Sequence, residues 1–280
     1  MTINYDNLVL EELNYHSYLK IEQLLSLQQF RSNPAHHDEM FFIIIHQTAE
    51  LWFKEVLHET GTLVQAFRDG EVSHALKIFK RIQAIMNLQV KQIRLLATLT
   101  PVEFAGFRDL LKPASGFQSA QFREIEFTYG IRNPFFLKFF EKIPEVRDRL
   151  TAAQSKASVY DEFFKCLQRC GFPVSEELLN RDFEKPWEFR QDALNLIFEI
   201  YQNPKDHYHL VLLFESMLDF DEALMLWRKT HSVMVARTIG SKKGTGGSTG
   251  YEFLRSREDL RCFPEIWEVR NTIGDINDGN

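Results

Sequence analysis

The sequence predicts an all-α protein, a helical bundle built on long antiparallel helices. Apolar residues recur at intervals of three and four through long stretches of the chain, which is the spacing of one face of an α-helix. Alternating runs of β-branched residues, which would indicate strands, are scarce. Capping and helix-breaking residues fall at the ends of the periodic stretches, so the helices can be placed in order along the chain.

Two long periodic stretches near the start of the chain predict a helical pair. Asp38 can cap a helix that runs to about Ala66, and Ser73 can start a second helix that continues to about Leu99. Because the connection between them is short, we expect the two helices to be antiparallel neighbours.

A short helix is predicted to start at Pro101. Thr100 offers a capping hydroxyl, Pro101 occupies the first helical position, and Glu103 completes a capping box with Thr100. The same order of cap and proline recurs at Asn133-Pro134. A helix should therefore begin at each proline.

The rest of the chain continues the helical pattern. Further helices are predicted at residues 119–129, 134–142, 158–170 and 191–202, with Gly130 and Gly171 at two of the stops. The last long helix should run from about Asp206 to about Thr238. The glycine-rich segment 241–250 then breaks the pattern, and composition alone favours a surface loop there.

Composition excludes several classes of protein. The chain has 280 residues, 44% hydrophobic and 26% charged, which suits one globular domain or two closely packed ones. A net charge of −6 offers no basic surface for nucleic acid, and the longest apolar run, residues 40–45, is too short to span a membrane. The N-terminus lacks the features of a secretory signal, and three cysteines with no C-x-x-C pair support neither a disulfide framework nor a cysteine zinc site. We expect a cytoplasmic protein whose ligands are small molecules.

One histidine lies in the apolar stripe of the last long helix. The stripe, at spacings of four and three, consists of Leu213, Met217, Phe220, Leu224, Trp227, His231 and Met234. His231 could be a core histidine with satisfied ring nitrogens, which is the commoner case. The alternative is an axial ligand of a haem iron, which needs a neutral imidazole in an apolar wall. No C-x-x-C-H motif is present, so such a haem would be held without thioether bonds.

A second set of residues combines aromatic and polar side chains. His46 shares a helix face with Phe42, and Phe104 and Arg108 lie four residues apart on the short capped helix. Because a guanidinium stays charged, Arg108 needs an anion, either a structural carboxylate or the carboxylate of a ligand. Together the four side chains could recognise an aromatic amino acid.

Other metal sites are possible on motif evidence. The Glu-x-x-His motif occurs at Glu55…His58 and at Glu71…His74, a pattern found in ferritin-like di-iron proteins. In those bundles each motif lies within a core helix, whereas the second motif here lies at a predicted helix start. Adjacent His36 and His37 point about 100° apart on a helix, so joint ligation would need a loop.

Several segments together resemble one family, the tryptophan 2,3-dioxygenases, over about residues 15–271. The matching segments are Pro34-Ala35-His36-His37-Asp38-Glu39-Met40, His46-Gln47-Thr48-Ala49-Glu50-Leu51-Trp52, Gly106-Phe107-Arg108-Asp109, Ser115-Gly116-Phe117-Gln118-Ser119, Leu226-Trp227-Arg228 with His231, and Gly244-Thr245-Gly246-Gly247-Ser248. The resemblance implies an enzyme that adds both atoms of O2 across the indole C2=C3 bond of L-tryptophan to give N-formyl-L-kynurenine. It also implies one non-covalent haem b in each subunit.

The resemblance implies roles for residues around the haem. His231 corresponds to the axial haem ligand, and His46 to the catalytic histidine that hydrogen-bonds the indole N–H. We interpret His46 as a positioning group, since attack from C3 does not require that proton to leave first. Phe42 corresponds to the aromatic residue on the indole. Phe104 stands where some relatives have tyrosine, so a polar contact to the substrate is lost here.

The resemblance also implies the groups that bind the amino-acid end and the neighbouring subunit. Arg108 corresponds to the arginine that binds the substrate carboxylate, Thr245 to a loop threonine at the amino-acid moiety, and Ser115 to a polar group near the haem. Tyr15 and Tyr18 correspond to residues that reach a neighbouring pocket in a homotetramer. Residues 1–32 would then serve the neighbouring subunit, and residues 33–280 would form a single haem-binding catalytic domain.

Three alternatives stay open at this point. A haem sensor or carrier would need His231 but has no use for Arg108 and Thr245. A helical scaffold would bind neither haem nor tryptophan. An indoleamine-type dioxygenase would open the same ring with looser substrate choice.

Overall fold

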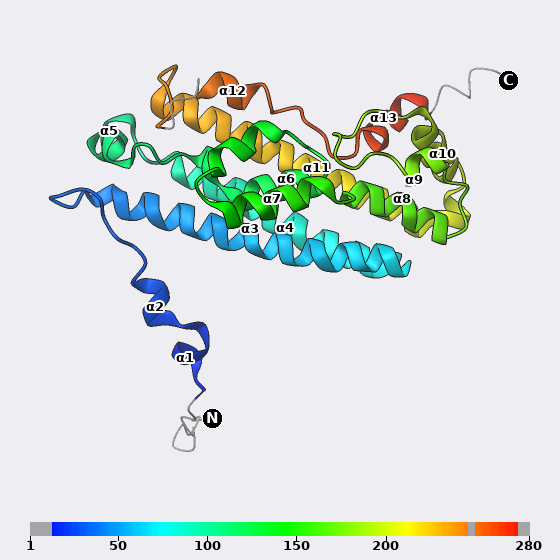
Figure 1. The fold of residues 1–280 in the computed structure, drawn as a ribbon, viewed down its shortest axis with the longest axis horizontal. Coiled ribbons are helices and arrows are strands. Elements are labelled where there is room, and N and C mark those ends of the chain that lie inside the picture. Colours follow the sequence, from blue (N-terminus) through cyan, green and yellow to red (C-terminus); the bar gives the residue numbers. More distant parts are fainter. Residues whose placement is uncertain (1–12, 246–249, 274–280) are drawn as a thin grey trace, which may run out of the picture.

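The computed structural model describes residues 13–245 and 250–273, and all regular structure in these residues is helical (Figure 1). The predicted all-α class is confirmed. The α-helices are α1 (Tyr15–Leu19), α2 (Ile21–Leu25), α3 (His37–Asp69), α4 (Val72–Leu96), α5 (Pro101–Arg108), α6 (Ala120–Thr128), α7 (Pro144–Ser155), α8 (Val159–Arg169), α9 (Glu176–Leu179), α10 (Gln191–Gln202), α11 (Pro204–Ile239), α12 (Tyr251–Arg255) and α13 (Pro264–Thr272). The 3₁₀ helices are η1 (Asp109–Leu111), η2 (Gly116–Gln118) and η3 (Pro134–Phe140). Within these ranges, no helix has both the length and the hydrophobicity needed to cross a membrane.

Three long helices form the frame of the molecule (Figure 1). α3 and α4 are joined by a tight turn at Gly70, whose φ of 75° suits a residue without a side chain, so the two helices are antiparallel as predicted. α4 also packs along α11. The C-terminal ends of α4 and α11 meet, with Leu96 and Met234 in one apolar cluster. The start of α3 and the short helix α5 lie at this same end.

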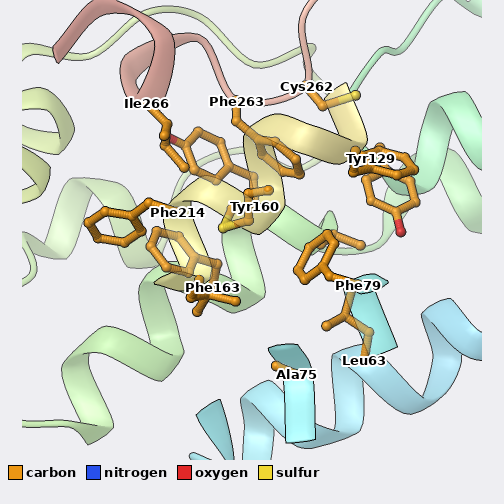
Figure 2. Close-up of a cluster of buried hydrophobic side chains, with 14 of the residues drawn as sticks. Leu63, Ala75, Phe79, Tyr129, Tyr160, Phe163, Phe214, Cys262, Phe263 and Ile266 are labelled. Atoms are coloured by element: carbon orange, nitrogen blue, oxygen red, sulfur yellow. The ribbon is translucent and has the colours of Figure 1, made fainter. Parts of the chain in front are cut away.

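Aromatic side chains fill the opposite half of the bundle (Figure 2). Phe79 of α4, Phe163 of α8, Phe214 of α11, Tyr129 and Phe263 are all fully buried. Their rings come from segments far apart in the sequence, so this core ties the long helices to α8 and to the C-terminal segment.

Two buried carboxylates hold the C-terminal segment on the bundle. Asp221 of α11 accepts hydrogen bonds from the backbone N–H of Cys262 at 3.0 Å and from Trp267 Nε1 at 3.0 Å. Glu265 accepts from Trp187 Nε1 at 2.9 Å. Burial raises the pKa of both carboxyl groups, and the N–H donors partly oppose the rise.

An N-terminal arm, residues 13–30, extends away from the bundle (Figure 1). It contains α1 and α2, and neither helix has a buried residue. Tyr15 and Tyr18 of α1 are 70% and 71% exposed. These two tyrosines therefore lie outside the body of their own chain.

The predicted helix starts and ends were mostly correct within a few residues. The cap of α3 was wrong: His36 is the cap, its Nδ1 accepts the N–H of Asp38 at 3.3 Å, and Asp38 belongs to the first turn. α4 begins one residue before the predicted Ser73, and it ends three residues before the predicted Leu99. The capping box of Thr100 and Glu103 is confirmed.

Several elements differ from the prediction, since the helices α1, α2, α9, α12 and α13 were not predicted. The segment predicted as a helix over 134–142 is the 3₁₀ helix η3, in which Phe136 and Phe140 are buried, and a proline starts this tighter turn. α7 was missed, because Leu150 is its one buried residue and the apolar period is therefore weak. Near the start of α11, His207 departs from helical angles, so the regular helix begins close to the predicted Asp206.

Candidate active site

A cavity of about 520 Å³ opens at the end of the bundle where α3, α4, α5 and α11 meet. Its volume lies in the range of small-molecule and cofactor sites. The walls are mainly aliphatic and aromatic, with a few polar groups. The predicted site residues among its lining are Phe42, His46, Phe104, Arg108, Ser115, His231 and Thr245. Residues from five separate stretches of the sequence thus share one cavity.

His231 enters the cavity wall from α11. It lies one turn beyond Trp227, and the two ring centroids are 5.3 Å apart. Among the described residues, neither ring nitrogen of His231 makes a hydrogen bond. Burial lowers its pKa to about 4, with smaller contributions from the nearby charges of His46 and Arg123. The imidazole is therefore neutral at physiological pH and has a nitrogen lone pair available to a ligand.

His46 is held in one orientation by its own helix. Its Nδ1 lies 2.7 Å from the carbonyl oxygen of Phe42, which can only accept a hydrogen bond, so Nδ1 carries the proton. The side chain is accessible through the cavity, yet burial lowers its pKa, an effect that the Phe42 carbonyl and Glu50 partly oppose. In the neutral ring, Nε2 is then a hydrogen-bond acceptor.

The aromatic residues form a connected group beside His46. The ring centroids of Phe42 and His46 are 4.2 Å apart, and those of Phe42 and Phe104 are 5.5 Å apart and nearly parallel. Phe107 packs edge-on against both phenylalanines. These ring contacts therefore pack the cavity wall formed by α3 against the wall formed by α5.

The short helix α5 is docked tightly on the start of α3. The ring of His36 packs on Phe107 at 5.2 Å, and it covers Gly106 so closely that a Cβ at this position would lie 2.5 Å from His36 Nε2. A side chain at position 106 would therefore have to displace the His36 ring. The contact packs α5, which carries Phe104 and Arg108, against the start of α3.

Arg108 has no carboxylate partner among the described residues. Its Nη2 donates to the carbonyl oxygen of Lys243, and its Nε is buried without a hydrogen-bond partner in the described part of the chain. The structural ion pair considered for this arginine is therefore not what the structure shows. The guanidinium keeps donors for a ligand anion.

The segment after α11 returns over the cavity and carries Thr245. The hydroxyl of Thr245 donates to the carbonyl oxygen of Ala114 at 2.5 Å. Ser115, the next residue, caps η2 and accepts the N–H of Phe117 at 3.4 Å. The rest of the glycine-rich motif, residues 246–249, lies outside the described residues.

The structure adds a buried charge cluster that sequence reasoning missed. Glu126 of α6 lies 2.5 Å from Arg123 Nη1, 3.0 Å from Arg228 Nη2 and 3.2 Å from Arg257 Nη2, and all four residues line the cavity. Burial would raise the pKa of Glu126, but the three arginines more than offset this and lower it. Arg123 and Glu126 stand three apart on a predicted helix, which hinted at a pair, yet nothing in the sequence placed Arg228 and Arg257 beside them.

The remaining predicted residues are not gathered into a metal site. In the described residues, no three His, Cys, Asp or Glu side chains lie close enough together to hold a metal ion, so the Glu55…His58 and Glu71…His74 motifs do not build a di-iron centre. His36 serves as a helix cap. Tyr15 and Tyr18 are not part of their own chain's cavity.

Comparisons with known proteins agree with this site. The sequence profile described as tryptophan 2,3-dioxygenase matches residues 6–153 and 153–273. The tryptophan 2,3-dioxygenase of Rhodococcus jostii (strain RHA1) is 44% identical over 264 residues, which cover 94% of this chain and 93% of the relative. The enzyme of the same name from Myxococcus xanthus (strain DK1622) is 41% identical, covering 92% and 89%, and that of Arthrobacter sp. (strain FB24) is 43% identical, covering 94% and 92%. The chain therefore belongs to the tryptophan 2,3-dioxygenase family.

Proposed function

We propose that this protein is a haem-dependent dioxygenase that converts L-tryptophan and O2 into N-formyl-L-kynurenine. The observation that carries the proposal is that one cavity gathers a neutral histidine with no hydrogen bond, His231, and a group that suits an aromatic amino acid, Phe42, His46, Phe104 and Arg108. Family membership supports the same reaction.

The residues present fit a haem b. The cavity has broad aromatic and aliphatic walls, which suit a flat macrocycle, and the neutral imidazole of His231 would hold its iron. The chain has no C-x-x-C-H motif, so the group would be held without covalent bonds, one in each subunit. When bound, the haem supplies the activation of dioxygen.

His46 would position the indole ring. Because Nδ1–H is tied to the Phe42 carbonyl, Nε2 faces the substrate as an acceptor for the indole N–H. Phe42 and Phe104 would hold the ring by stacking and edge contacts. His46 thus orients the C2=C3 bond, and no proton needs to leave the indole before attack.

Arg108 and Thr245 would bind the amino-acid end of the substrate. The buried Nε of Arg108 and its neighbouring N–H groups can take a carboxylate in bidentate fashion. Ser115 would be a further polar group near the haem. Phe104 lacks the hydroxyl that some relatives have at its position, so the carboxylate depends more heavily on Arg108.

The assembly and location of the protein follow as part of the proposal. The exposed tyrosines of α1, Tyr15 and Tyr18, support an arm that reaches a neighbouring subunit in a homotetramer, while residues 33–280 form one catalytic domain. A net charge of −6 gives no support for binding nucleic acid, and we expect the enzyme to act in the cytoplasm.

The proposal is tested by spectroscopy of the reconstituted protein. The ferrous form, kept free of oxygen, should show a haem absorption band that shifts on addition of L-tryptophan. Admission of labelled ¹⁸O2 should then yield N-formylkynurenine containing both label atoms. In the Arg108→Ala variant the haem band should persist while the tryptophan-induced shift is lost. A protein that takes up no haem would contradict the proposal.

A further inference from the structure

The cluster around Glu126 contains more positive than negative charge. Three arginines surround one glutamate, a net charge of +2, and the side chains of Arg123, Arg228 and Arg257 are only 7%, 5% and 14% exposed. Burying unbalanced charge is costly unless a counter-ion is supplied. Because the cluster lines the cavity, a ligand in the cavity can supply that counter-ion.

Two of the three arginines are held through Glu126 alone. Within the described residues, Arg123 donates only through Nη1 and Arg257 only through Nη2, in both cases to Glu126. The Nε atoms of Arg123 and Arg228 are both buried without a partner in the same residues. Arg228 differs in having a second partner, because its Nη1 also donates to the carbonyl oxygen of Leu260 and so holds the segment before α13. Arg123 and Arg257 are therefore the pair whose remaining N–H groups are least committed to the protein.

Aromatic contacts keep these two guanidinium groups in place. Phe136 lies 4.1 Å from the guanidinium carbon of Arg123 and 5.2 Å from that of Arg257, and Phe122 lies 4.8 Å from that of Arg123. A guanidinium whose face is stacked on a ring still offers its edge to a planar anion such as a carboxylate. The cluster is thus organised before any ligand binds.

The charge of the whole cavity indicates what the ligand is. Its charged lining consists of four arginines and two glutamates, again a net charge of +2 with neutral histidines. Tryptophan is a zwitterion with no net charge, and its carboxylate already has a partner in Arg108. Haem b carries two propionate carboxylates on a macrocycle that is neutral with ferrous iron, so its charge complements the cavity.

We propose that Arg123 and Arg257, held in place by Glu126, form the subsite that binds the propionate carboxylates of the haem. This inference rests on the proposed function, because it concerns the same cofactor. Arg123, Arg257 and the proposed iron ligand His231 line the same cavity. The haem would thus be held through its iron by His231 and through its carboxylates by Arg123 and Arg257.

The experiment compares haem b with its dimethyl ester, which has the same macrocycle and iron but no free carboxylates. The apoprotein is titrated with each form, and the loss of each form to excess apomyoglobin is followed by absorption. Wild-type protein should bind haem b at least about tenfold more tightly than the ester, since a hydrogen bond to a charged group has about that effect. In Arg257→Gln and Arg123→Gln this preference should shrink through weaker binding of haem b, with binding of the ester unchanged.

Control variants separate the subsite from general damage. Arg149→Gln is matched, because Arg149 pairs with Glu124 of the same helix as Arg123 at 3.0 Å but is half exposed and does not line the cavity. It should keep the wild-type preference, and Arg257→Lys should recover part of it. Equal binding of the two haem forms by wild-type protein that still oxidises tryptophan would overturn the subsite alone. Failure of the wild type to bind either form would overturn the proposed function as well.

Discussion

The two ends of the helical bundle treat buried polar groups in different ways. At the end away from the cavity, Asp221 and Glu265 are surrounded by N–H donors of the protein itself, and aromatic rings fill the remaining space. At the cavity end, Arg108 Nε and Arg123 Nε have no partner among the described residues, and the His231 ring makes no hydrogen bond there. Buried groups without a partner also occur outside the cavity, at Arg132 and the Tyr160 hydroxyl, but at the cavity several of them line one space. Since a buried polar group without a partner lowers stability, this convergence marks a place where a ligand completes the structure.

The largest effect should come from removing His231. His231→Ala should abolish haem uptake and tryptophan oxidation, while the unfolding temperature of the apoprotein changes little, because this ring contributes no hydrogen bond to the described fold. Absorption spectra and thermal unfolding measure the two effects. His209→Ala, an exposed histidine on the same helix, is the control and should change neither. A His231→Ala protein with normal haem content would contradict the assignment of His231 as the haem ligand at the cavity end.

The next largest effect should be on stability at the opposite end. Phe220 is fully buried and its ring stacks on that of Tyr129 at 4.3 Å. Phe220→Ala should lower the free energy of unfolding by about 3–5 kcal/mol, which urea denaturation measures, because truncation leaves a cavity in a filled core. The folded variant should still bind tryptophan normally. If tryptophan affinity fell as much as stability, the two ends would not be separable.

A smaller effect is expected where α5 meets α3. Gly106→Ala would force its new methyl group against the His36 ring, which packs on Phe107, so the ring must turn away or α5 must shift with Arg108 and Phe104. We expect KM for tryptophan to rise roughly tenfold, the size of effect that a small misplacement produces, with haem content unchanged.

Two further variants sharpen the Gly106 test. His36→Ala combined with Gly106→Ala should restore much of the affinity by removing the clash. Gly61→Ala on α3 meets no atom within 4 Å and should be neutral or slightly stabilising. A Gly106→Ala enzyme with wild-type KM would show that α5 is not held by this contact.

The smallest effect should be a dependence on pH. Burial lowers the pKa of His46 below its ordinary 6.5, so its Nε2 should stay an acceptor as the pH falls through that value. Tryptophan affinity should thus be flat around pH 6.5 and decline only at more acidic pH, once Nε2 is protonated. Titrations of the ferrous protein across this range would measure it. A decline already centred at the ordinary histidine pKa would contradict the assignment of His46 as acceptor.

The same contrast explains how much the sequence could predict. The apolar stripe containing His231 and the capping box at Thr100 are local patterns, and both were read correctly. The turn at η3 and the cap at His36 were missed because each depends on packing between segments. The meeting of Glu126 with Arg257, 131 residues away, depends on tertiary structure alone. The resemblance of sequence motifs identified the family. The spacing of apolar residues could not show which buried side chains would lack hydrogen-bond partners.

The contact between Arg108 and the Lys243 carbonyl has a consequence for substrate affinity. The guanidinium has five N–H groups, and one of them, on Nη2, already donates to the main chain of the segment that carries Thr245. The Nε–H and the remaining N–H groups stay available to a bidentate carboxylate. On the proposed function, the same guanidinium would hold the substrate carboxylate and this backbone segment at once. Changes in the segment should therefore alter the affinity for tryptophan through the position of Arg108, with no change to any group that touches the indole.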